Sequence, residues 1–250
     1  MRHFLSILRV AIFEETISFT MKKLNKTRNL LLIAFLFSSF LSTAQERVIN
    51  LGDFNILKVF SGVTLELIRS DEQKIVIIGE KKENLTVKNT NGRLKVFLRF
   101  PEIYNDKDVN IKLYYKEDLD ILDANEGAAI FSDQTFNQQQ VTIRAQEGAY
   151  IHLVLDMKYV TVKAVSGGNI RLRGKVTDQE IEVTTGGVYE GYELDSEIAE
   201  VSSASGGRVE LKTSSFLDAK VRFGGKIEYK GNPVKVKTNK IMGGSVINKS

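Results

Sequence analysis

Apolar and polar residues alternate in short segments along most of the chain, and from residue 124 onward a short glycine-containing phrase follows each segment. Two examples are Asn125-Glu126-Gly127-Ala128 and Gly167-Gly168. An alternation with a period of two is typical of β-strands that turn one face toward a core and the other toward water. The pattern therefore predicts many short strands joined by tight turns.

The glycine phrases are evenly spaced. Their first glycines are separated by 21, 19, 19, 20, 18 and 19 residues. A period near 20 residues is a signature of a solenoid, in which each repeat forms one coil. We therefore predict an all-β fold, a right-handed single-stranded parallel β-helix (β-solenoid) with coils of about 19 residues. Because glycine adopts a positive φ at little steric cost, we expect the coils to turn at Gly127, Gly148, Gly167, Gly186, Gly206, Gly224 and Gly243.

The residues that follow each corner predict an inward and an outward column. The third residue after each first glycine is apolar and is expected to lie in the core: Ile130, Ile151, Ile170, Tyr189, Val209, Ile227 and Val246. The next residue is mostly polar and is expected to face outward: Phe131, His152, Arg171, Glu190, Glu210 and Glu228. Stacked glutamates cost stability unless a cation or a partner compensates them. The outward column is therefore either a solvated face or a ligand-binding strip.

Residues 45–122 are also strand-like but lack the glycine repeat. We expect this region to form wider coils that continue and cap the β-helix, in one domain with the regular repeats of residues 123–250. Within it, Asn91-Gly92 indicates a tight turn or hairpin. An aromatic cluster near Pro101 includes Tyr104, in the loop that is expected to project most. Exposed aromatic rings there could stack on sugars, although packing within a wider coil also explains them.

The sequence of the first 44 residues predicts that the protein is exported. Residues 21–44 have the basic stretch, apolar run and small-residue cleavage site of a signal peptide, with cleavage expected after Ala44. Residues 1–20 precede this complete signal, so Met21 is the better candidate start. No membrane span is expected after cleavage, since the apolar run is shorter than a spanning helix. The expected location is the periplasm, the outer-membrane surface or the extracellular space.

Composition limits the possible chemistry. Residues 1–44 hold six of the 35 basic and two of the 31 acidic side chains, so the remainder carries 29 of each and gives no support for nucleic-acid binding. There is no cysteine, and His152 is the one histidine outside the leader. We therefore expect no cofactor, no metal site and no enzyme activity. The alternative is a β-helix polysaccharide lyase or glycoside hydrolase, with carboxylates one rung apart as its catalytic pair.

A family resemblance adds to this interpretation. The segment from about Asp53 to Lys230 resembles the GIN domain family, described as the "putative autotransporter adhesin head domain" and formerly a domain of unknown function. The resemblance rests on the glycine repeat and on the order of Phe54, Ile56, Val59, Ser61-Gly62-Val63, Val76, Leu85, Val87, Gly92 and Leu94. It implies an adhesin-like envelope or surface module that binds a glycan or a partner protein. A purely structural envelope protein is the second alternative.

The chain ends directly after a glycine pair, with no capping segment behind the last coil. An open strand edge invites pairing with another chain. We therefore expect that a homo-oligomer can form through this C-terminal coil.

Overall fold

A computed structural model describes residues 46–79, 82–99 and 110–250 of the chain. The segment 1–20 ahead of the expected start at Met21, the expected signal peptide at 21–44 and the loop that carries Tyr104 lie outside the described residues. Residues Gln45–Ser250 form one compact unit.

The described residues are almost entirely β-structure, with a single 3-10 turn, η1 (Lys82–Asn84). The N-terminal region contains β1 (Arg47–Asn50), β2 (Ile56–Val59), β3 (Thr64–Arg69), β4 (Lys74–Ile78), β5 (Leu85–Thr90), β6 (Arg93–Leu98) and β7 (Asn110–Tyr115). The repeats contain β8 (Ile121–Ala124), β9 (Ala129–Gln146), β10 (Tyr150–Val165), β11 (Asn169–Thr184), β12 (Val188–Asp195), β13 (Ile198–Ala204), β14 (Arg208–Lys212), β15 (Phe216–Arg222), β16 (Lys226–Lys230), β17 (Lys235–Ile241) and β18 (Ser245–Asn248).

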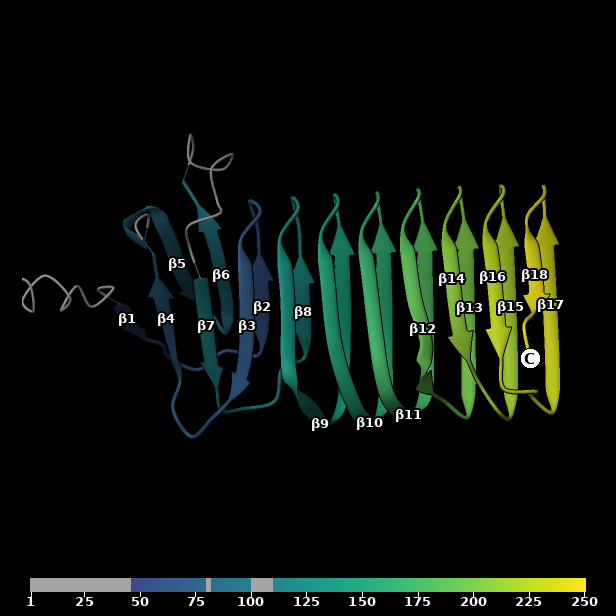
Figure 1. Ribbon diagram of the computed structural model, residues 1–250, viewed down its shortest axis with the longest axis horizontal. Helices are drawn as coiled ribbons and strands as arrows, with labels where there is room; N and C mark the ends of the chain where they lie inside the picture. The colour runs from purple at the N-terminus through teal and green to yellow at the C-terminus, as the bar shows by residue number, and fades with distance from the viewer. Residues whose placement is uncertain (1–45, 80–81, 100–109) are drawn as a thin grey trace, which may run out of the picture. The chain divides into compact units, whose positions relative to one another are not determined.

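The repeats form a β-solenoid of about seven coils, as predicted. Each coil contributes one strand segment to each of two facing layers, joined by a tight turn at one edge (Figure 1). All pairings between successive coils of the repeats are parallel; for example, Ile151 of β10 stands between Ile130 and Ile170 of the neighbouring coils. In β9, β10 and β11 one continuous strand runs through both layers, where the sequence predicted short separate strands.

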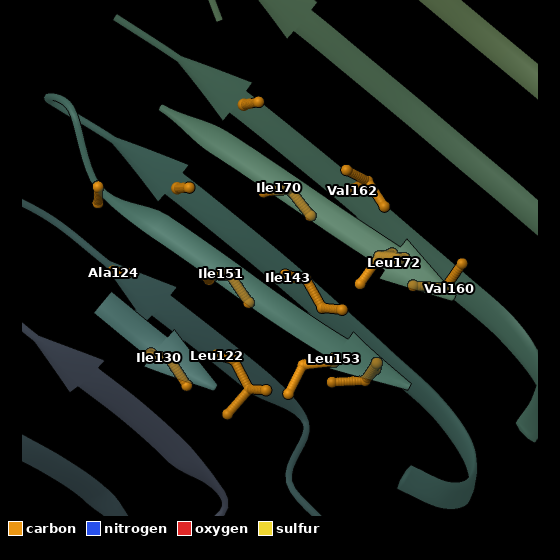
Figure 2. Packing of buried hydrophobic residues seen from close by; sticks show 14 of the residues in the cluster. Leu122, Ala124, Ile130, Ile143, Ile151, Leu153, Val160, Val162, Ile170 and Leu172 are labelled. Carbon is orange, nitrogen blue, oxygen red and sulfur yellow. The ribbon is translucent and has the colours of Figure 1, made fainter. Parts of the chain in front are cut away.

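The core lies between the two layers. The predicted inward column is buried as far as Ile227, with Ile130, Ile151, Ile170, Tyr189, Val209 and Ile227 all 0% exposed, whereas its last member, Val246, is only partly buried. Figure 2 shows this column facing the apolar side chains of the other layer, such as Leu122, Ile143 and Val162. Full burial of a Leu, Ile or Val side chain is worth roughly 1.5–3 kcal/mol, so these stacked columns hold the coils together.

The corners are tight turns in which two successive residues have positive φ. At one of them Ser166 has φ 50° and Gly167 has φ 76°, and the amide of Gly168 donates to the carbonyl of Val165 at 2.9 Å. These features define a type I′ turn. The second glycine has a different role, since a Cβ on Gly168 would lie 2.1 Å from the carbonyl oxygen of Ala145.

The N-terminal region is only partly a continuation of the coils. Strands β2 and β3 pair in parallel with β8 and β9, and β6 and β7 pair in parallel with β2 and β3. However, β4 runs antiparallel to β1 and β7, and β5 runs antiparallel to β6. The expectation of wider coils throughout 45–122 is therefore too simple. The hairpin turns at Asn91-Gly92, where both residues have positive φ.

The other end of the stack is an open edge. No described strand pairs with β17 or β18 beyond their partners β15 and β16. Two core columns become polar in this last coil: Ala219 is followed by Thr238, and Val221 by Lys240. These two columns therefore offer little apolar surface for a further coil to bury.

Candidate functional site

The predicted outward column exists in register on one layer. Phe131, His152 and Arg171 follow one another on β9, β10 and β11. Glu190, Glu210 and Glu228 continue the column on β12, β14 and β16. All six are half-buried except Glu228, which is 7% exposed. We call these six residues the outward ladder.

Ion pairs compensate two of the four charged residues of the outward ladder, Arg171 and Glu228. Arg171 pairs with Glu193 at 3.2 Å, rather than with Glu190. Glu190 accepts a hydrogen bond from the amide of Asn169 at 3.2 Å. The protein itself therefore compensates part of the charge of the outward ladder, which leaves less charge for an external ion to neutralise.

At its C-terminal end the outward ladder is strongly compensated. Lys226 and Lys249 lie 3.0 and 3.2 Å from the carboxylate of Glu228. Their hydrogen bonds, that of Lys226 foremost, hold the pKa of Glu228 below its ordinary value. Beside it, burial together with the charges of Glu210 and Glu228 raises the pKa of Tyr192 to about 12, so this phenol stays protonated.

His152 is more enclosed than the sequence suggested. Its Nε2 atom is buried without a hydrogen-bond partner among the described residues, and its ring meets that of Tyr150 edge-on at 6.4 Å. Burial, aided by the guanidinium groups of Arg173 and Arg171, lowers the pKa of His152. The imidazole is therefore neutral at pH 7 and adds no charge to the ladder.

A hollow lies on the other layer, where β10, β11 and β13 run side by side. Its volume is about 460 Å³, within the range of small-ligand sites. The floor includes the buried residues Val160 and Gln179, and the outward side chains are Tyr159, Thr161, Asp178, Glu180, Ile198 and Glu200. We call this feature the β11 hollow.

Two rows of residues define the β11 hollow. Tyr159, Asp178 and Ile198 occupy successive rungs, and Thr161, Glu180 and Glu200 form the adjacent row. Tyr159 is 46% and Ile198 37% exposed, which is unusual for residues of this size. The Oδ1 atom of Asp178 is buried without a hydrogen-bond partner among the described residues. The hollow thus combines apolar surface with an unsatisfied carboxylate oxygen.

A buried network fixes the floor of the β11 hollow. The side-chain amide of Gln179 donates to Ser196 at 2.7 Å and to the carbonyl of Lys212 at 3.2 Å. Its oxygen accepts the hydroxyl of Tyr189 at 2.9 Å. Tyr189 fits an isoleucine position of the core because Gly191 leaves space, since a Cβ there would lie 2.6 Å from the ring. Burial raises the pKa of Tyr189 far above its ordinary value, so it remains a donor.

The sequence prediction missed this hollow because the candidate site residues were taken from the positions after each corner. The signal was present, since Glu180, Glu200 and Asp218 recur 18 to 20 residues apart in register. Of the other predicted site residues, the corner glycines line the turn edge with φ between 71° and 86°. Tyr104 lies outside the described residues.

Other kinds of site find no support in the described part of the chain. It contains no group of three or more histidine or carboxylate side chains placed to hold a metal ion. Within the same residues, no helix has the length and apolar character needed to cross a membrane.

The parallel coils and a shallow polar and apolar hollow define a β-solenoid with the features of a binding module. The family comparison gives the more particular assignment. The chain belongs to the family described as "Putative auto-transporter adhesin, head GIN domain", whose model matches residues 53–233. The resemblance seen in the sequence is thereby confirmed. A search of curated proteins found no match.

Solved structures with the same fold come from Bacteroides and Parabacteroides species. A putative adhesin from Bacteroides fragilis has a TM-score of 0.75 at 18% identity, over 83% of this chain and 97% of its own. A putative adhesin from Parabacteroides merdae has a TM-score of 0.63 at 16% identity, over 82% and 96%. A putative lipid binding protein from Parabacteroides distasonis has a TM-score of 0.61 at 18% identity, over 82% and 96%. At these identities the similarity shows the fold alone.

Proposed function

We propose that this chain is an exported, non-catalytic binding module of the cell envelope or surface, and that it binds a glycan in the β11 hollow. The family description and the similar structures named as adhesins support the coarser part of this proposal. The observation that carries the finer part is the exposed ring of Tyr159 beside the carboxylates of Asp178, Glu180 and Glu200.

The chemistry of the β11 hollow suits a sugar. The face of an aromatic ring can pack on the apolar face of a pyranose, and carboxylate oxygens accept hydrogen bonds from its hydroxyl groups. Thr161 adds a hydroxyl that can donate or accept. The rigid sheet below the hollow reduces the ordering cost of binding, since the side chains project from paired strands and not from a mobile loop.

Glycan-array binding by the Gln45–Ser250 protein tests this proposal, with two matched pairs of substitutions. Glu180→Gln with Glu200→Gln removes two carboxylates on adjacent rungs of the hollow. Glu190→Gln with Glu210→Gln does the same on the outward ladder of the opposite layer. We expect the first pair to abolish array signals that the second pair leaves unchanged. Loss with the second pair alone would reject the hollow and favour the ladder.

One observation favours a second candidate function, a glycoside hydrolase. Glu180 and Glu200 are direct register partners on neighbouring strands, which lie about 4.8 Å apart. Retaining glycosidases place their carboxyl groups at roughly 5–5.5 Å. Incubating the wild-type protein with each array-positive glycan distinguishes the two functions. Unchanged glycan supports a binding module, whereas shortened products that disappear with Glu200→Gln would establish an enzyme.

A further inference from the structure

A second surface, at the opposite end of the stack from the last coil, is built entirely from hydrogen-bond donors and cations. The hairpin β5–β6 carries a hollow of about 330 Å³ lined by Lys88, Thr90, Asn91, Arg93 and Lys95. No carboxylate lines it. We call it the hairpin hollow. It is separate from the β11 hollow, so it does not depend on the function proposed above.

The register concentrates positive charge at the hairpin hollow. Lys88 on β5 lies directly opposite Lys95 on β6, and Lys95 is in turn the register partner of Lys58 on β2. Arg93 and Thr90 face one another two pairs closer to the turn, on the same face of the hairpin. Like charges directly opposite each other on a sheet are destabilising. Three cations on successive strands therefore carry a cost that a bound anion would relieve.

The protein compensates only one of these cations. Lys58 pairs with Asp123 at 2.6 Å, and this carboxylate is 2% exposed. Within the described residues, Lys88, Arg93 and Lys95 have no carboxylate oxygen within salt-bridge distance. Lys88 lies 6.0 Å from the ring centre of Phe97, a contact that leaves its ammonium protons free to donate. The uncompensated cations are thus the ones that line the hollow.

We propose that the hairpin hollow binds an oxyanion, a phosphate or sulfate group carried by a polymer or free in solution. Lysine and arginine donate charge-assisted hydrogen bonds to such groups, and arginine can hold two oxygens at once. The hydroxyl of Thr90 and the amide of Asn91 supply neutral donors beside them. The tight turn at Asn91-Gly92 fixes the ends of both strands, so the donors are held on a rigid frame.

Binding of dextran sulfate and of uncharged dextran, measured by biolayer interferometry on the Gln45–Ser250 protein, tests the proposal. We expect only the sulfated polymer to bind, with affinity that falls as salt is added. Lys88→Gln with Lys95→Gln should weaken binding about tenfold or more. The control, Lys235→Gln with Lys237→Gln on β17, removes the same charge at the far end and should leave affinity unchanged.

Two further arms complete the experiment. Lys88→Arg with Lys95→Arg should retain binding, which separates a need for cations from a folding defect. Competition by inorganic phosphate would identify a small oxyanion as sufficient, whereas displacement only by sulfated polymer would identify a polymer as the source; either outcome supports the site. Equal losses in the hairpin and β17 variants, or no loss in the hairpin variant, would overturn it.

Discussion

The paired glycines of the corners should differ sharply in how they tolerate a methyl group. Gly167 has a positive φ, but the nearest atom to a Cβ there would be the backbone nitrogen of Gly148 at 4.0 Å, an ordinary van der Waals contact. Gly167→Ala therefore carries only the cost of a left-handed backbone, about 1–2 kcal/mol. Gly168 does not have a positive φ, but its Cβ would lie 2.1 Å from the carbonyl oxygen and 2.4 Å from the carbonyl carbon of Ala145. These are backbone atoms of the preceding coil, which cannot rotate away.

Gly168→Ala must therefore separate two coils locally. Overpacking a well-packed interior costs typically about 1–3 kcal/mol, and we expect this substitution to lie at or above the upper end. Urea unfolding followed by far-UV circular dichroism measures both variants against wild type, with the slope checked for loss of two-state behaviour. The first two corners have alanine in the second position, at Ala128 and Ala149. If Gly168→Ala costs no more than Gly167→Ala, that corner relaxes as those do, and close approach is not its constraint.

Three further outcomes follow from buried polar contacts. Gln179→Leu removes the hydrogen-bond acceptor of the Tyr189 hydroxyl and should lower the free energy of unfolding by about 1–3 kcal/mol. In urea unfolding, the double variant with Tyr189→Phe should lose less stability than the two single variants lose together. Lys58→Ala should cost about 3–5 kcal/mol in the same assay, because the buried carboxylate of Asp123 loses the only cation it pairs with among the described residues and keeps only the neutral amide of Asn125 as a partner. A cost below about 1 kcal/mol, as for an exposed ion pair, would refute this. The depressed pKa of Glu228 means that its stabilising contribution is present above the ordinary carboxyl pKa and is lost as the pH falls through the lower folded value. Glu228→Gln should therefore lower the melting temperature at pH 7 and have a shrinking effect in acid.

Much of the repeat architecture was predictable because it depends on local rules. The inward column from Ile130 to Ile227 follows from strand alternation and from the need to bury apolar surface. The hairpin at Asn91-Gly92 follows from turn chemistry alone. The antiparallel direction of β4 was not predicted. Its sequence Lys74-Ile75-Val76-Ile77-Ile78 is apolar at successive positions, and such a pattern does not distinguish a parallel from an antiparallel strand.

The corner geometry was predicted in part. The sequence pointed to a positive φ at the first glycine, but the residue before it has a positive φ as well. This residue is Ser166 at one corner and Phe223 at another, so its side chain gives no consistent signal. The second glycine is set by the distance to the preceding coil, a tertiary property that no local pattern contains.

Candidate sites were harder to predict, because a column shows which residues stack but not which neighbours compensate them. The pairing of Arg171 with Glu193, instead of with its rung neighbour Glu190, depends on the shift in register between β11 and β12. Two residues one rung apart in a sequence alignment of repeats can therefore have different partners in space. The homo-oligomer through the last coil stays a prediction, and the lysines of β17 limit it, since charged edge strands pair poorly.

The solenoid places like residues above like, and this has opposite consequences for its two kinds of column. An apolar column gains stability with each coil, whereas a charged column accumulates repulsion at a spacing of about 4.8 Å. The protein relieves this repulsion at Lys58 with Asp123 and at Glu228 with Lys226 and Lys249. The repulsion between stacked charges is not relieved at the hairpin hollow or at the β11 hollow, and both of these surfaces are concave. Where a repeat protein stacks like charges in a depression, a ligand is the best source of the missing counter-charges or hydroxyl groups. The combination of stacked like charge and concavity therefore selects these two surfaces over the outward ladder.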